Sequence, residues 1–152
     1  MIDFIADVAA NHNGDLERCR RLMAAAAETG CAAVQFSLSR LEHLYAPQIL
    51  QVSSSHRQQR RQELPQHFLP HLVEWSEELD LKLGLTIFDL DMVDRVQSHV
   101  DFLSISPYEL PWLDLIDRAA DTGLPLILDS GMADAGETWN AVQTALEAGC
   151  TE

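Results

Sequence analysis

A short apolar stretch followed by a stretch with helical spacing recurs five times along this 152-residue chain. Similar phrases stand near the ends of three helical stretches: Glu28-Thr29-Gly30-Cys31, Asp121-Thr122-Gly123-Leu124 and Glu147-Ala148-Gly149-Cys150. The first two phrases lead into an apolar run, whereas only two residues follow the third. Strands that alternate with helices through short connections predict a parallel sheet covered by helices.

The apolar runs predict five strands and the stretches between them predict five helices. The strands are expected at 3–9, 32–37, 82–88, 101–106 and 125–129, and the helices at 15–29, 66–80, 90–98, 111–122 and 135–148. Asp89 is a predicted helix N-cap, and Asp134 with Glu137 forms a capping-box pattern. Gly30 stands where a C-terminal cap glycine is expected. Residues 38–63 are expected to form a long polar loop.

Two α/β architectures fit this order of elements. One is a partial TIM (β/α) barrel of about five βα units, and the alternative is an open doubly wound parallel sheet. No Gly-x-Gly-x-x-Gly or Walker loop supports the nucleotide-binding version of the open sheet. The interrupted sixth unit favours the barrel, which normally takes about 250 residues. Residues 1–152 are therefore expected to form one barrel domain that is incomplete at its C-terminus.

An incomplete barrel has consequences for assembly. An open arc of five strands is expected to expose two sheet edges and an apolar inner face. The chain is therefore expected to form a homo-oligomer, to pair with a chain that completes the barrel, or to be a fragment of a longer protein.

Composition excludes several classes of function. The net charge of −14 argues against a nucleic-acid partner, because an acidic chain repels a phosphate backbone. No apolar run approaches the roughly 20 residues that cross a bilayer, so no membrane association is expected. The three cysteines show neither disulfide nor metal-site spacing, which indicates a reducing, cytoplasmic location.

Polar residues gather after the predicted strands, where ligands bind in either architecture. They are Asp7, Asn11, His12, Gln35, Ser37, Arg40, Thr86, Asp89, Ser104, Ser106, Glu109, Asp129 and Ser130. Lys82 opens the third strand at the opposite end, which excludes Schiff-base chemistry for these five units. His12 is either an acid–base group or a residue that orders its loop. Arg57, Arg60 and Arg61 form either a lid over an anionic substrate or, as we favour, a solvated helical turn.

Five ordered motifs resemble the sialic acid synthase (N-acetylneuraminate synthase) family. The segment from Phe4 to Asp15, which contains Asn11-His12-Asn13-Gly14, resembles the family's opening strand and turn. The other motifs are Leu44-Tyr45-Ala46-Pro47, Thr86-Ile87-Phe88-Asp89, Glu109-Leu110 and Asp129-Ser130-Gly131-Met132. They occur in the family's order along the whole chain.

The resemblance implies a fold and an activity. Family members have a TIM barrel followed by a small antifreeze-like domain, and this chain resembles the N-terminal part of the barrel. They condense phosphoenolpyruvate with an N-acetylated sugar aldehyde to give a nine-carbon sugar acid. A divalent metal, manganese or magnesium, is expected from the family, with its ligands outside this chain.

The resemblance also implies roles for individual residues. Asp7 and Glu109 are the expected catalytic residues; the expected substrate-binding residues are Asn11, Gln35, Ser37, Arg40, Thr86, Ser106, Asp129 and Ser130. The family has lysines where this chain has Gln35 and Ser104, and serines at Pro107 and Asp129. Each lost cation removes charge-assisted hydrogen bonds worth about 1.5–3 kcal/mol.

These departures leave two functional readings. The first is a divergent synthase of this family that is inactive or altered as an isolated chain. The alternative is a non-catalytic, sugar-binding or regulatory relative that assembles with another chain.

Overall fold

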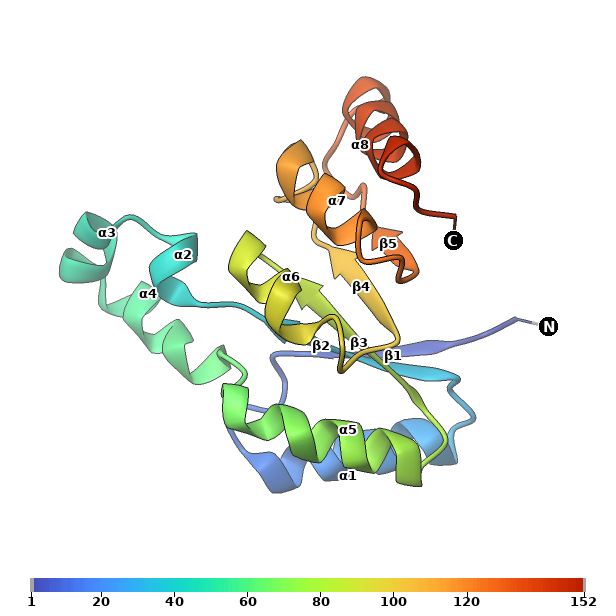
Figure 1. The fold of residues 1–152 in the computed structure, drawn as a ribbon. Helices are drawn as coiled ribbons and strands as arrows, with labels where there is room; N and C mark the ends of the chain where they lie inside the picture. The colour runs from blue at the N-terminus through green and yellow to red at the C-terminus, as the bar shows by residue number, and fades with distance from the viewer. Residues whose placement is uncertain (1, 152) are drawn as a thin grey trace.

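The computed structural model describes residues 2–151 as one parallel sheet with helices packed on it (Figure 1). The strands are β1 (Ile5–Ala9), β2 (Ala33–Leu38), β3 (Lys82–Ile87), β4 (Phe102–Ile105) and β5 (Leu126–Leu128). They lie in the order β1-β2-β3-β4-β5, and each neighbouring pair is parallel. A doubly wound sheet requires a reversal in strand order, so this sequential order excludes the alternative and confirms the partial barrel.

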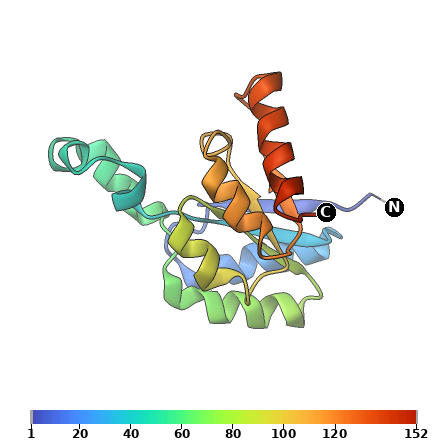
Figure 2. The same cartoon turned by 45° about the horizontal axis from the view of Figure 1, so that its top comes forward.

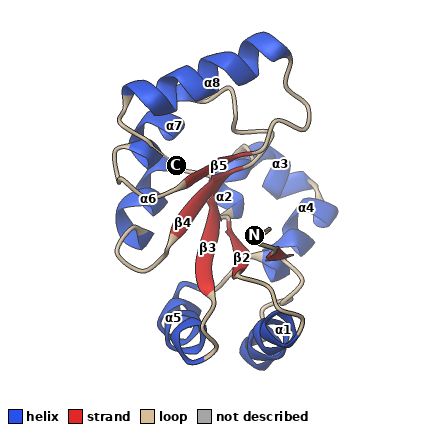
Figure 3. Ribbon diagram, turned by 90° about the vertical axis from the view of Figure 1, so that its right-hand side faces the viewer, coloured by secondary structure: helices blue, strands red, loops and turns tan. Residues whose placement is uncertain are grey.

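A helix follows each strand. These helices are α1 (Leu16–Glu28), α5 (Leu69–Glu78), α6 (Leu90–Val96), α7 (Leu113–Ala120) and α8 (Ala135–Glu147). Figure 3 shows the strands curving into an arc whose convex side carries α1, α5, α6 and α7. Helices α1 and α5 lie side by side, as Figures 1 and 2 both show. Among residues 2–151, no helix is long and apolar enough to cross a membrane.

The core forms between the sheet and these helices because alternate strand residues point to one face. On β2, Val34, Phe36 and Leu38 belong to this buried cluster, whereas Gln35 and Ser37 between them do not. Strand β3 follows the same rule with Leu83, Leu85 and Ile87, and fully buried Leu115 and Ile116 of α7 add to the cluster.

Helix ends follow the predicted capping chemistry. The Asp89 carboxylate accepts a hydrogen bond from Met92 N at 3.1 Å, which confirms the predicted N-cap of α6. The Asp134–Glu137 capping box is present at α8. Gly30 has φ +80°, a conformation that favours glycine after a helix.

The segment 39–63, which we call the excursion, differs from the predicted loop. It contains α2 (Leu41–Leu44), α3 (Pro47–Val52), α4 (Ser54–Gln58) and the 3-10 helix η1 (Gln59–Gln62); a second 3-10 helix, η2 (Gln66–Phe68), precedes α5. Each piece is short, so tertiary contacts rather than propensity stabilise it. Arg57 Nη1, for example, donates to Leu50 O at 2.8 Å and to Gln51 O at 2.9 Å. The excursion projects away from the sheet in Figures 1 and 2.

The inner face of the arc is polar near the carboxyl ends of the strands, where Gln35, Thr86 and Ser104 lie, so the expected apolar inner face is present only in part. Its apolar members include Phe102, which is buried because its ring lies against Gly84 on the neighbouring strand. A Cβ atom added at Gly84 would stand 2.0 Å from Phe102 Cζ, so only glycine permits this ring position.

Candidate functional site

Two rows of inner-face side chains cross the sheet near the carboxyl ends of its strands. In the deeper row, Asp7 of β1 pairs with Gln35 of β2, and Gln35 pairs with Gly84 of β3. In the outer row, Ser37 pairs with Thr86, and Thr86 pairs with Ser104. The register therefore brings into one row residues that lie up to 77 positions apart in the chain, from Asp7 to Gly84.

The central part of these rows is neutral and hydrogen-bonded. Gln35 Nε2 donates to Thr86 Oγ1 at 2.9 Å. Thr86 and Ser104 are buried, and Ser37 is half-buried. Hydroxyl and amide groups in this position can hydrogen-bond a neutral polar ligand, but they supply no positive charge to an anion.

The end of β1 and the turn that follows it carry two predicted site residues. Asp7 Oδ1 accepts a hydrogen bond from Ala9 N at 3.0 Å, and Asn11 Nδ2 donates to Val8 O at 3.0 Å. Both side chains are exposed. The turn is tight, with φ +47° at Ala9 and a register shift between Asp7 and Ala9.

His12 is completely buried in this turn. Its Nδ1 atom accepts a hydrogen bond from Gly14 N at 3.0 Å, and its Nε2 atom has no partner among residues 2–151. Burial, with a smaller contribution from Arg18, lowers the pKa of the imidazole. The hydrogen bond to Gly14 favours the loop-ordering interpretation over an acid–base role, because it occupies one nitrogen and the other is inaccessible to solvent.

Arg40 is held by an ion pair at the start of the excursion. Its Nη2 atom lies 2.8 Å from Asp89 Oδ1 and its Nε atom donates to Asp89 Oδ2 at 3.3 Å. The Asp89 side chain is only 7% exposed. His43 Nδ1 lies 3.4 Å from Asp89 Oδ2, so the carboxylate faces two basic side chains. Arg40 is therefore already engaged and offers a ligand little uncompensated positive charge.

Ser106 and Glu109 lie together in the turn after β4. The Ser106 hydroxyl donates to Glu109 Oε2, and Glu109 N donates to Ser106 O at 3.1 Å. Glu109 is half-buried, and this burial raises the pKa of its carboxyl group against the opposing effect of the Ser106 hydrogen bond.

Asp129 and Ser130 follow β5 and are exposed. Asp129 Oδ1 accepts a hydrogen bond from Gly131 N at 3.0 Å, which closes a turn within its own loop. The loop adjoins the one that carries Glu109, because a Cβ atom at Gly131 would lie 3.5 Å from Pro107 Cγ. The last two strands, β4 and β5, thus bring Ser106, Glu109 and Asp129 to one part of the rim, the edge of the sheet formed by the carboxyl ends of its strands.

The described residues do not fit the divalent metal implied by the family resemblance. Within residues 2–151, no group of three or more His, Cys, Asp or Glu side chains could hold a metal ion. We assign no metal-dependent step to these side chains.

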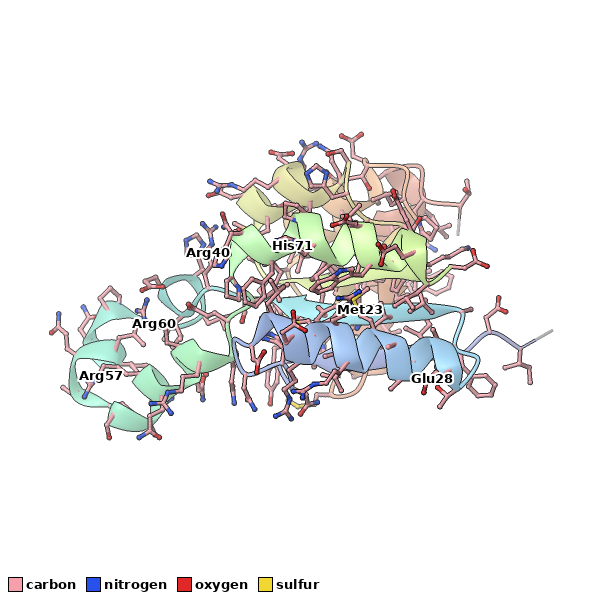
Figure 4. The ribbon with its side chains drawn as sticks, turned by 90° about the horizontal axis from the view of Figure 1, so that it is seen from below. Met23, Glu28, Arg40, Arg57, Arg60 and His71 are labelled. Atoms are coloured by element: carbon pink, nitrogen blue, oxygen red, sulfur yellow. The ribbon has the colours of Figure 1, made fainter. Side chains whose placement is uncertain are left out.

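A polar cavity of about 490 Å³ lies between the turn after β1 and the excursion. Its lining residues are Asn13, Ser55, Gln58, Gln59, Arg61 and Gln62. Sequence reasoning did not select this set, because the short helices that carry five of its members have no clear periodicity. Arg57 and Arg60 lie on the projecting part of the excursion, and Arg40 lies nearer the sheet (Figure 4).

Comparison with known proteins establishes the family. A family model described as the NeuB family matches residues 22–152. The chain belongs to the NeuB family. It is 30% identical over 149 residues to an uncharacterized protein of Methanocaldococcus jannaschii, covering 97% of this chain and 43% of the relative. It is also 29% identical to an N,N'-diacetyllegionaminic acid synthase of Legionella pneumophila, covering 92% of this chain and 42% of that enzyme.

A solved structure extends the family match to three dimensions. The sialic acid synthetase of Leptospira borgpetersenii, crystallised with citrate, superposes with a TM-score of 0.89 at 25% identity, covering 98% of this chain and 51% of that one. This confirms the resemblance to sialic acid synthases and the barrel-type fold. The chain spans less than half the length of the two curated relatives above.

Proposed function

We propose that residues 1–152 form the first five βα units of a synthase that condenses phosphoenolpyruvate with an N-acetylated sugar aldehyde. The observation that carries this proposal is the match to the NeuB family over residues 22–152, which include every proposed site residue except Asp7 and Asn11. The product would be a nine-carbon sugar acid, as the names of the related legionaminic acid and sialic acid synthases suggest.

In this proposal the carboxylates and hydroxyls of the rim bind the sugar. Glu109 has a fixed position and a half-buried carboxyl group, so it is suited to accept a hydrogen bond from a sugar hydroxyl. Asp7 keeps an exposed carboxylate at the end of β1. Thr86 and Gln35 present polar groups on the inner face between them.

The inner face offers little positive charge to the anionic co-substrate, phosphoenolpyruvate. Phosphoenolpyruvate carries phosphate and carboxylate charges, whereas Gln35 and Ser104 are neutral and Arg40 is paired with Asp89. Asp129 adds like charge at the neighbouring loop. Among the described residues, Arg61 of the excursion borders the polar cavity and is a candidate for a further cation.

A second candidate function follows from this shortage of unpaired positive charge. A non-catalytic relative would bind the sugar, lack affinity for phosphoenolpyruvate and act with another chain. The neutral inner-face row favours this candidate over full catalysis by the chain alone.

Both candidate functions include assembly with another chain. The β5 edge exposes a groove of about 300 Å³ lined by Leu126, Leu128, Val142, Ala145, Leu146, Cys150 and Thr151. At the other edge, Phe4 is 64% exposed. We propose that a second copy or a further chain covers these edges. Light scattering after size-exclusion chromatography tests this, since a stable monomer would contradict it.

Calorimetric titration and an activity assay separate the two functions. The chain is titrated with N-acetylmannosamine and, separately, with phosphoenolpyruvate, and turnover is followed as phosphate release. Binding of both ligands with turnover supports the synthase, and Glu109→Gln should abolish that turnover. Binding of the sugar alone, without phosphate release, supports the non-catalytic relative. Absence of sugar binding would reject both.

A further inference from the structure

The turn after β4 is closed on itself by two hydrogen bonds between the same residues. Glu109 N donates to Ser106 O at 3.1 Å, as in a β-turn, and the Ser106 hydroxyl donates to Glu109 Oε2. Pro107 occupies the second position of this turn, where its fixed φ is favoured. The turn therefore holds Ser106 and Glu109 at a fixed separation.

Neighbouring contacts fix the main chain on both sides of Glu109. Trp112 N donates to Glu109 O at 2.8 Å, and the next residue, Leu110, is completely buried. Pro107 packs close to Gly131 of the adjacent loop. With the main chain fixed, the remaining freedom of Glu109 lies in its side-chain torsions, and the Ser106 hydroxyl restricts these.

The geometry leaves one carboxylate oxygen available. Within residues 2–151, Glu109 Oε2 accepts from Ser106, and Oε1 has no hydrogen-bond partner in the same range. The half-buried position disfavours the ionised form, and the Ser106 hydroxyl opposes this by hydrogen-bonding it. Tyr108, between them in the turn, is 76% exposed and provides no comparable contact.

We infer that Ser106 is a positioning residue that holds the Glu109 carboxyl group in one orientation, with its second oxygen presented to a hydroxyl group of the ligand. This differs from the expected role of Ser106 as a direct substrate contact. The identity of the ligand rests on the proposed function, whereas the action of Ser106 on Glu109 does not depend on it.

A matched pair of variants isolates the hydroxyl. Ser106→Thr retains the hydroxyl. Ser106→Val has nearly the same side-chain shape as Ser106→Thr but carries a methyl group in place of the hydroxyl. Ser98→Ala serves as a control, because exposed Ser98 lies beyond the end of α6 and hydrogen-bonds only His99. Carboxyl carbon NMR of glutamate-labelled protein reports the pKa of Glu109, with Glu109→Gln identifying its signal.

The inference predicts a specific pattern of pKa values. Loss of a hydrogen bond to a charged group should raise the pKa of Glu109 by about one to two pH units in Ser106→Val. Ser106→Thr and Ser98→Ala should leave it at the value of the unmodified chain. Equal pKa values in the Thr and Val variants would overturn the inference.

Ligand binding then separates this inference from the proposed function. If the unmodified chain binds N-acetylmannosamine, Ser106→Val should weaken that binding about tenfold or more relative to Ser106→Thr, as expected for a charge-assisted contact. If no variant binds the sugar, the proposed function fails, while the NMR comparison still decides the role of Ser106. Should the Val variant not fold, Ser106→Ala provides the same comparison, and an unshifted pKa there would again overturn the inference.

Discussion

The contact between Gly84 and Phe102 predicts that Gly84→Ala destabilises the sheet through one ring. A Cβ atom at Gly84 would lie 2.0, 2.2 and 2.5 Å from Cζ, Cε2 and Cε1 of Phe102. Carbon atoms prefer separations of about 3.5–4.0 Å, so the ring must leave its position over β3. Both residues are buried now, and Phe102 is only 5% exposed.

The magnitude follows from two opposing contributions. Moving the Phe102 ring from its buried position to the open inner face costs about 1.5–3 kcal/mol. Gly84 does not have a positive φ, so alanine fits its backbone and stabilises by about 0.4–1 kcal/mol through the unfolded state. The net loss in the free energy of unfolding should therefore be about 0.5–2.5 kcal/mol, within the range for overpacked cores.

A double-mutant cycle measures this coupling. Urea unfolding followed by circular dichroism compares the unmodified chain with Gly84→Ala, Phe102→Ala and the double variant. Once the ring is absent, Gly84→Ala should be neutral or slightly stabilising, which gives a coupling energy of about 1.5–3 kcal/mol. An equal cost for Gly84→Ala with and without the ring would refute the argument, because the clash would then not be its cause.

Three further predictions concern buried polar groups. Because the pKa of His12 is lowered in the folded chain, its contribution to stability is complete above the unfolded pKa of about 6.5 and is lost as the pH falls toward the folded pKa. The urea concentration at the midpoint of unfolding should therefore fall more steeply between neutral and mildly acidic pH in the unmodified chain than in His12→Gln. Parallel slopes in the two proteins would contradict this. Arg40→Gln should lower the free energy of unfolding by about 1–3 kcal/mol, because buried Asp89 loses its arginine partner and keeps only His43 and the Met92 N hydrogen bond. Asp89→Asn in the same background should recover part of this loss in denaturation assays. Burial raises the pKa of Cys19 to about 11. Iodoacetamide at mildly alkaline pH should therefore leave this thiol unmodified in the folded chain, as measured by peptide mass spectrometry. Rapid alkylation would contradict this, because it would show that the thiol is accessible.

The five βα units were predictable because each depends on local pattern. The predicted strands and helices agree with the observed ones to within about three residues at each end, which is the usual uncertainty of element boundaries. The caps at Asp89 and Asp134 were also predictable, because a cap is set by residues three positions apart. The partial barrel was predicted from the alternation of strands and helices, and the sequential strand order agrees with it.

The excursion and the site contacts were not predictable in the same way. Helices of four to six residues are shorter than the window in which periodicity is detectable, so α2, α3 and α4 gave no signal. The bond between Arg40 and Asp89 joins residues 49 positions apart. Sequence identified both as rim residues but could not show that each already has the other as its partner. Burial of His12 likewise depends on packing against the sheet near Phe36.

The same ion pair limits what the rim can bind. A site for a phosphorylated acid needs cations that remain unpaired until the ligand arrives, because a charge already satisfied by a carboxylate gains little from exchange. Arg40 does not meet this requirement, and Asp7, Glu109 and Asp129 surround a neutral central row. These charges agree with the sugar binding proposed above, because the hydroxyls of a neutral sugar can donate to the carboxylates. Anion binding would require cations that lie outside this central row, such as Arg61 at the polar cavity of the excursion.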